Sequence, residues 1–143
     1  MQTQNFKNHS RFVPLFHFVL SLLILGCLFV SIRMVVKNWN TDMRNLSILL
    51  SGISLSLLLS WYYLRTFPIK AQDRAIRAEE NLRHFALTGK LLDKRLTMGQ
   101  IVALRFADDT EFLLLTEKAA NENMPATAIK KSIVNWREDN HRA

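Results

Sequence analysis

The chain contains few of the residues on which most catalytic and metal sites depend. Its 143 residues include one cysteine, four glycines and four histidines. The single cysteine, Cys27, excludes an intrachain disulfide, and no histidine has a neighbour at metal-ligand spacing. The four glycines are too scattered to form a phosphate-binding loop or a dinucleotide fingerprint. We therefore expect neither an enzymatic activity nor a cofactor.

Charge is nearly absent from the first part of the chain. Residues 1–64 carry six charged side chains, whereas residues 65–143 carry 25. The stretches 12–32 and 45–64 contain no Asp, Glu, Lys or Arg. A membrane-spanning helix needs about 20 mostly apolar residues, and it satisfies its own backbone polar groups. The sequence predicts a short tail over residues 1–11 and a transmembrane hairpin over 12–67, with spans at about 15–36 and 45–64.

The basic residues predict how this hairpin is oriented. The first apolar run is too long for a signal peptide and lacks an A-x-A-like site, so we expect an uncleaved anchor. Lys and Arg gather on the cytoplasmic side of a membrane. Six of these residues flank the hairpin on the side of the two termini, and three lie on the side of its loop. This distribution predicts both termini in the cytoplasm and a multi-pass protein of the bacterial inner membrane. Four of these residues follow the second span, where we expect contact with lipid headgroups: Arg65, Lys70, Arg74 and Arg77.

The second span contains two sets of small residues on different sides. Small residues allow transmembrane helices to approach closely. We expect one set, together with Cys27 and Ser31 of the first span, to pack the two spans together: Gly52, Ser56 and Ser60. The other set would then form a face for another membrane protein: Ser47, Ser51 and Ser54.

Residues 68–143 are expected to form a cytoplasmic helical domain, which begins with a long amphipathic helix. Thr66 and Pro68 can start this helix and Gly89 can end it. Its apolar residues repeat at steps of four and three, as in a heptad seam: Ala71, Ala75, Ala78, Leu82 and Phe85. The seam either rests on the rest of the C-terminal domain or joins two copies of the chain. Acid-before-base pairs at i, i+4 favour an exposed helix: Asp73 with Arg77, and Glu79 with Arg83.

Three short helices are predicted after a polar link over residues 90–96. The first begins at Thr97 with a capping box to Gln100, and the second begins at Asp108 with Glu111 in the same relation. The third has Pro125 in its first turn. The expected buried residues are Met98, Ile101 and Leu104, then Phe112, Leu115 and Ala119, then Ile129, Ile133 and Trp136. About 45 residues fold poorly alone, so we expect the long helix to complete this core.

A helix-turn-helix is an alternative interpretation of these three helices. The last helix would then read DNA through Lys130, Lys131, Asn135 and Arg137. Basic residues do not outnumber acidic ones in residues 97–143, whereas nucleic-acid binding needs a basic excess. We therefore expect no nucleic-acid partner, and we keep a membrane-anchored DNA-binding regulator as the second hypothesis.

Several polar stretches resemble one known family. They are QNFKNH at 4–9, DRAIRAE at 73–79, LRHFALTGK at 82–90, GQIVALRFA at 99–107 and IKKSIVNW at 129–136. Together they are similar to an uncharacterised family of small two-span bacterial membrane proteins, grouped under a domain of unknown function. The resemblance implies an inner-membrane protein with a helical cytoplasmic tail, and it implies no activity, ligand or catalytic residue.

The sequence thus predicts an all-α protein: a two-helix transmembrane hairpin, a long amphipathic helix and a small three-helix cytoplasmic bundle. The expected partners are the lipid bilayer and either another membrane protein or a second copy. The function that we expect is that of a non-enzymatic accessory or scaffold protein of the membrane, which docks partners through its hairpin and tail.

Overall fold

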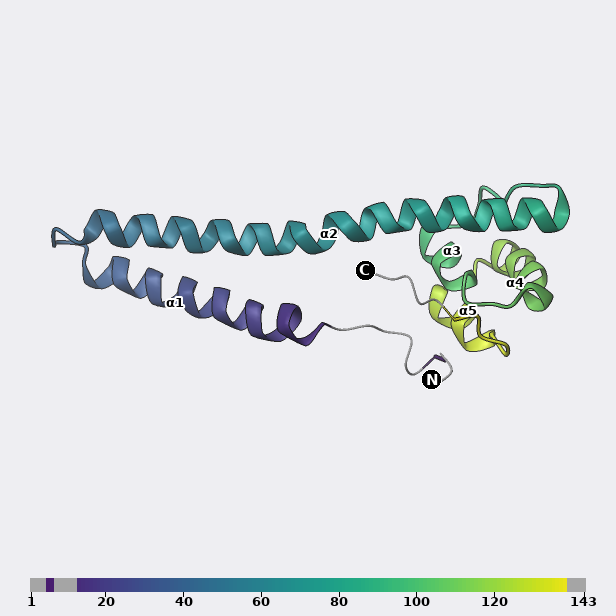
Figure 1. The fold of residues 1–143 in the computed structure, drawn as a ribbon, viewed down its shortest axis with the longest axis horizontal. Helices are drawn as coiled ribbons and strands as arrows, with labels where there is room; N and C mark the ends of the chain where they lie inside the picture. Colours follow the sequence, from purple (N-terminus) through teal and green to yellow (C-terminus); the bar gives the residue numbers. More distant parts are fainter. Residues whose placement is uncertain (1–4, 7–12, 139–143) are drawn as a thin grey trace. The chain divides into compact units, whose positions relative to one another are not determined.

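A computed structural model describes residues 5–6 and 13–138, and the described part of the chain is helical (Figure 1). A π-helical turn, η1 (Leu15–Leu20), leads into α1 (Ser21–Lys37). The other helices are α2 (Arg44–Thr88), α3 (Met98–Leu104), α4 (Asp109–Glu122) and α5 (Ala126–Ser132). Strands are absent from the described ranges, which confirms the all-α class. The chain divides between Phe67 and Pro68 into two compact units. We call their described parts the hairpin unit (13–67) and the C-terminal unit (68–138, together with residues 5–6).

In the hairpin unit, α1 and the first part of α2 run antiparallel on either side of the loop 38–43 (Figure 1). In both helices the side chains that face the other helix recur at alternating steps of four and three residues. This spacing keeps one stripe of a helix facing its neighbour. The inward side chains of η1, of α1 and of the residue that follows α1 include His17, Ser21, Ile24, Leu28, Ser31, Val35 and Asn38. Those of α2 are Ser47, Ser51, Ser54, Leu58 and Trp61.

Helix α2 is longer than the sequence predicts. The expected second span and the expected amphipathic helix form one continuous helix of 45 residues, with Pro68 inside it. Proline lacks an N–H and crowds the carbonyl four residues before it, yet one missing hydrogen bond does not end a helix that is favoured on both sides. The prediction of a new helix start at Thr66 is therefore wrong. The predicted end is confirmed, because Gly89 has a φ of 72° and its N–H donates to the Phe85 carbonyl at 2.7 Å.

The C-terminal unit has one apolar core, to which α2 contributes Ile76. This contribution confirms that the long helix completes the core. Leu92 and Leu96 also lie in the core, although the sequence predicts a polar link there. The remaining buried members are Ile101, Ala103, Leu104, Phe106, Ala107, Phe112, Leu115, Ala119, Ile129 and Ile133.

The predicted helix starts are largely confirmed. Thr97 and Gln100 form a complete capping box at α3, and Asp108 caps α4 by accepting a hydrogen bond from the Thr110 N–H. Glu111 does not complete a second box. Its carboxylate instead accepts hydrogen bonds from the backbone N–H groups of Val134 and Asn135, at 3.2 and 2.8 Å. Glu111 therefore fixes the chain that follows α5.

The third helix is shorter than predicted. Helix α5 ends at Ser132, so Ile133 and Trp136 are not helical. The chain after α5 is held by an antiparallel bridge between Ala107 and Trp136, and the Trp136 ring packs 5.2 Å from the Phe106 ring. Pairing with residues 106–108 replaces the last helical turn.

Candidate functional site

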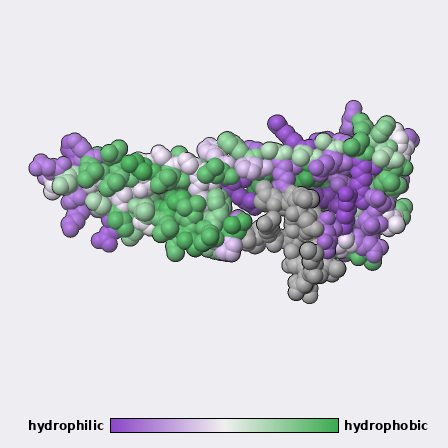
Figure 2. All heavy atoms as spheres, in the orientation of Figure 1, coloured by the Kyte–Doolittle hydropathy of each residue, from purple (hydrophilic) through white to green (hydrophobic). Residues whose placement is uncertain are grey.

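The hairpin unit exposes an unusual amount of apolar surface (Figure 2). Large hydrophobic side chains are exposed along both helices; Leu15, Leu22 and Val36 are each at least 73% exposed. Only 11% of the most apolar stretch of each long helix is buried. The core helix of a soluble protein would be mostly buried, whereas these two helices are exposed and are long and apolar enough to cross a membrane.

The two sets of small residues lie opposite to the predicted arrangement. The serine face (Ser47, Ser51 and Ser54) packs toward α1, with Ser47 and Ser54 buried. The small-residue stripe (Gly52, Ser56 and Ser60) is exposed and lies along a groove that Leu49, Ile53 and Leu57 complete. In the first span Ser31 is buried, whereas Cys27 is exposed beside an apolar groove. The assignment of the stripe to the hairpin contact is therefore wrong.

The serines of the serine face find hydrogen-bond partners within α2 itself. The hydroxyls of Ser47, Ser51 and Ser54 donate to the carbonyl four residues earlier at 2.9–3.0 Å. Their polar atoms are thereby satisfied inside the helix, so the face needs no polar partner.

Polar and aromatic contacts hold both ends of the hairpin. Near the loop, the Asn38 side-chain amide donates to the Ser47 hydroxyl at 3.1 Å. At the other end, the Trp61 Nε1–H donates to the Phe16 carbonyl at 3.3 Å, and the two rings stack with their centroids 5.9 Å apart. These contacts fix which residues of the two helices oppose each other.

The basic cluster (Arg65, Lys70, Arg74 and Arg77) remains available for contacts outside the chain. Arg65 is half-buried in the hairpin unit, and the other three are exposed in the C-terminal unit. None of the ion pairs found among the described residues involves these four. The predicted pair of Asp73 with Arg77 is therefore not formed.

The seam on α2 (Ala71, Ala75, Ala78, Leu82 and Phe85) is also not covered by the rest of the described chain. All five side chains are exposed, with Leu82 at 68% and Phe85 at 50%. The C-terminal unit instead packs on another side of the helix, through Ile76 and Glu80. The interpretation in which the seam rests on the rest of its own domain is therefore wrong.

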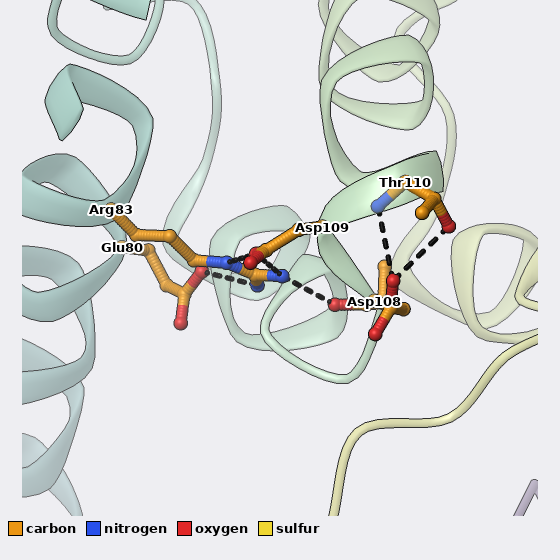
Figure 3. A network of polar contacts seen from close by, with 6 residues as sticks. Glu80, Arg83, Asp108, Asp109 and Thr110 are labelled. Carbon is orange, nitrogen blue, oxygen red and sulfur yellow. Dashed lines mark hydrogen bonds and ion pairs between the residues drawn. The ribbon is translucent and has the colours of Figure 1, made fainter. Parts of the chain in front are cut away.

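Arg83 is the centre of the polar contact between α2 and the start of α4 (Figure 3). Its guanidinium pairs with Glu80 at 3.1 Å and with Asp109 at 2.6 Å, and it donates to the Ala107 carbonyl at 2.8 Å. It also lies 4.1 Å from the centre of the Phe112 ring, a cation–π distance. The predicted pair with Glu79 is wrong, because Glu80 is the acid turned toward the core.

Burial gives Glu80 an unusual proton affinity. Desolvation raises the pKa of its carboxyl above the ordinary value of 4.5, despite the opposing effect of Arg83. The folded chain thus holds this proton more tightly than the unfolded chain, so ionisation of Glu80 lowers stability as the pH rises above 4.5. Asp93 and Asp108 have lowered pKa values, because hydrogen bonds from Arg95 and Thr110 stabilise their charged forms. Their contribution to stability is lost at lower pH, below 3.8.

Glu80→Gln should remove the part of this pH dependence that lies above 4.5. We expect the free energy of unfolding of the variant to change less than that of the parent chain between mildly acidic and neutral pH. Denaturant titrations of the full chain in mild detergent at several pH values measure the difference. Parallel curves for the two proteins would show that Glu80 does not titrate in this range.

The C-terminal unit contains a polar cleft whose charged side chains pair with one another. It is lined by residues that include His84, Asp93, Arg95 and Asn121. Arg95 already pairs with Asp93 at 2.7 Å and donates to Asn121 at 3.0 Å, while His84 contacts the Lys90 carbonyl at 2.7 Å. Within residues 13–138, no group of His, Cys, Asp and Glu could hold a metal ion.

The residues proposed for DNA reading do not share a helix. Lys130 and Lys131 lie in the last turn of the seven-residue α5. Asn135 and Arg137 lie beyond it, where the Asn135 carbonyl accepts from the Asp108 N–H and the Arg137 N–H donates to the Phe106 carbonyl. A recognition helix needs its reading side chains on one helix face, so the helix-turn-helix interpretation loses its geometric basis.

One comparison with known proteins covers the whole chain. The model of a family of unknown function, DUF6526, matches residues 1–143. No curated protein and no solved structure matches the chain.

Proposed function

The chain belongs to this family of unknown function, and we propose that it is a non-enzymatic accessory or scaffold protein of the bacterial inner membrane. Its hairpin unit would span the bilayer with both termini in the cytoplasm. Its C-terminal unit would be the small cytoplasmic bundle that presents surfaces to partners.

The exposed apolar surface of the hairpin unit carries this proposal. The helix over Leu15–Lys37 has 23 residues, which at 1.5 Å per residue extend about 34 Å. The hydrocarbon core of a bilayer is about 30 Å thick. Helices that expose leucine, isoleucine and phenylalanine along this length are stable in lipid, where their surface meets apolar chains instead of water.

The basic cluster supports the orientation. Arg65 and Lys70 follow the predicted second span by only a few residues, which places them at the level of the lipid headgroups. Arg74 and Arg77 lie further along α2, where the negative surface potential still acts within a Debye length. Each exposed basic side chain near an anionic leaflet gains about 1 kcal/mol.

The small-residue stripe supports a docking role within the membrane. Gly52, Ser56 and Ser60 are exposed along one groove of α2, and the hairpin contact does not use them. A second transmembrane helix could approach the backbone closely there. The proposed partner face is thus the stripe and not the serine face.

Membrane fractionation tests the anchoring. We expect the full chain to remain in the membrane pellet after an alkaline carbonate wash, and reporter fusions to place Ala143 in the cytoplasm and Asn40 outside it. A chain released by the wash would contradict the bilayer anchor, and an external Ala143 would contradict the orientation.

A photo-crosslinking residue at Ser56 tests the docking surface, with Ser51 as the matched control on the same helix. We expect adducts with another membrane protein from position 56, which is exposed, and few from position 51, which faces α1. Equal adduct yields at the two positions, or none at either, would contradict docking through the stripe.

A further inference from the structure

We infer that the seam on α2 joins two copies of the chain side by side and in parallel, in a short coiled coil over residues 71–85. This inference rests on the proposed function, because it takes both copies to be anchored in one membrane. It identifies a second copy as the partner of a surface that the C-terminal unit leaves uncovered.

The spacing of the seam assigns a heptad register. Ala75 and Leu82 occupy a positions, and Ala71, Ala78 and Phe85 occupy d positions. In this register Ile76 and Glu80 fall at positions b and f, away from the a–d stripe. Ile76 and Glu80 thus lie outside the side that a second copy would need, while Asn81, at a g position beside it, accepts a hydrogen bond from the Leu92 N–H.

The charged residues beside the seam favour a second copy as the occupant. Arg74 occupies a g position and Glu79 the next e position. In a parallel pair the g residue of one helix faces the following e residue of its partner, so Arg74 of each copy would face Glu79 of the other. Both side chains are exposed, and neither takes part in an ion pair among the described residues.

The same charges favour the parallel arrangement over the antiparallel one. In an antiparallel pair g positions face g positions and e positions face e positions, so Arg74 and Glu79 would never meet. Two chains inserted in the same sense also direct their α2 segments the same way. The charge pattern and the proposed anchoring thus select the same orientation.

The alanines determine how strong this contact is. Three small side chains let the helices approach closely but bury little apolar area, so we expect little association in dilute solution. Confinement to one bilayer raises the effective concentration of the copies without any new contact. The test therefore uses the full chain in its membrane.

Single-cysteine crosslinking in a Cys27→Ser background tests the pairing. Ala78→Cys places a thiol at a d position, and Arg77→Cys places one a single residue away, on the flank of the helix. We expect several-fold more disulfide-linked dimer from position 78 on mild oxidation, because a disulfide needs β-carbons within about 4.5 Å.

Charge exchange in the Ala78→Cys chain tests the orientation. Arg74→Glu should lower the dimer yield several-fold, and the added change Glu79→Arg should restore it. Equal crosslinking at positions 77 and 78 in membrane pellets would overturn the coiled coil, and a failed restoration would overturn the parallel pairing. A chain absent from the pellets would instead overturn the membrane anchor.

Discussion

Arg83→Met is expected to destabilise the C-terminal unit by about 3–5 kcal/mol, the usual cost of leaving a buried charge without its partner. The Arg83 side chain is 10% exposed and its partner Glu80 is 7% exposed. Methionine preserves much of the packing but removes the ion pairs to Glu80 and Asp109 and the hydrogen bond to the Ala107 carbonyl. Glu80 would then be buried without a cation.

Fluorescence can follow this loss in the full chain. In a Trp39→Phe, Trp61→Phe background, Trp136 alone reports on the C-terminal unit, since its ring packs on Phe106. Denaturant unfolding in mild detergent should show a lower midpoint for Arg83→Met, and Arg77→Met is the control on the exposed side of the helix.

A second substitution separates the buried charge from the packing. Adding Glu80→Leu to Arg83→Met removes the unpaired carboxylate, and we expect much of the lost stability to return. If Arg83→Met unfolds at the same denaturant concentration as the parent chain, the network does not hold α2 to the start of α4.

Phe112→Ala is the other large expected effect, at about 3–5 kcal/mol. Phe112 is fully buried in the core between α2 and the short helices, and its ring lies under the Arg83 guanidinium. Truncation removes buried apolar surface and leaves a cavity that well-packed neighbours fill only in part.

The same fluorescence measurement checks this variant. Leu114→Ala is the matched control, because Leu114 lies on the same helix and is 72% exposed. We expect the control to unfold at the same denaturant concentration as the parent chain. Combining Phe112→Ala with Arg83→Met should cost less than the two single losses added together, since the residues share one contact. If the double variant loses as much stability as the two single variants added together, the two residues are not energetically coupled.

Local signals in the sequence determined much of the helical structure. The capping box of Thr97 and Gln100, the cap at Asp108 and the stop at Gly89 all appear as predicted. These features depend on residues within one turn of each other, so their geometry follows from short-range sterics and hydrogen bonding. The buried positions of α4 also follow from its 3.6-residue periodicity.

Pro68 and Trp136 show where local signals are insufficient. Proline commonly starts a helix, yet here α2 passes through it because both flanking segments are helical. Trp136 continues the apolar spacing of α5, but the bridge to Ala107 draws it out of the helix. At Pro68 the stability of the flanking helical segments outweighs the local preference for a helix start. At Trp136 a contact with a residue distant in sequence outweighs the local preference for helix.

By itself, the sequence determined that the chain is all-helical, that it carries two long apolar stretches and that charge gathers after the second of them. Only the tertiary structure decided which side of each helix is covered. Serines 47, 51 and 54 lie on the side of α2 that faces α1, and the alanine seam stays exposed because the core takes Ile76 instead. Periodicity shows which residues share a side, but the covering side depends on the shape and charge of a neighbour that is distant in sequence.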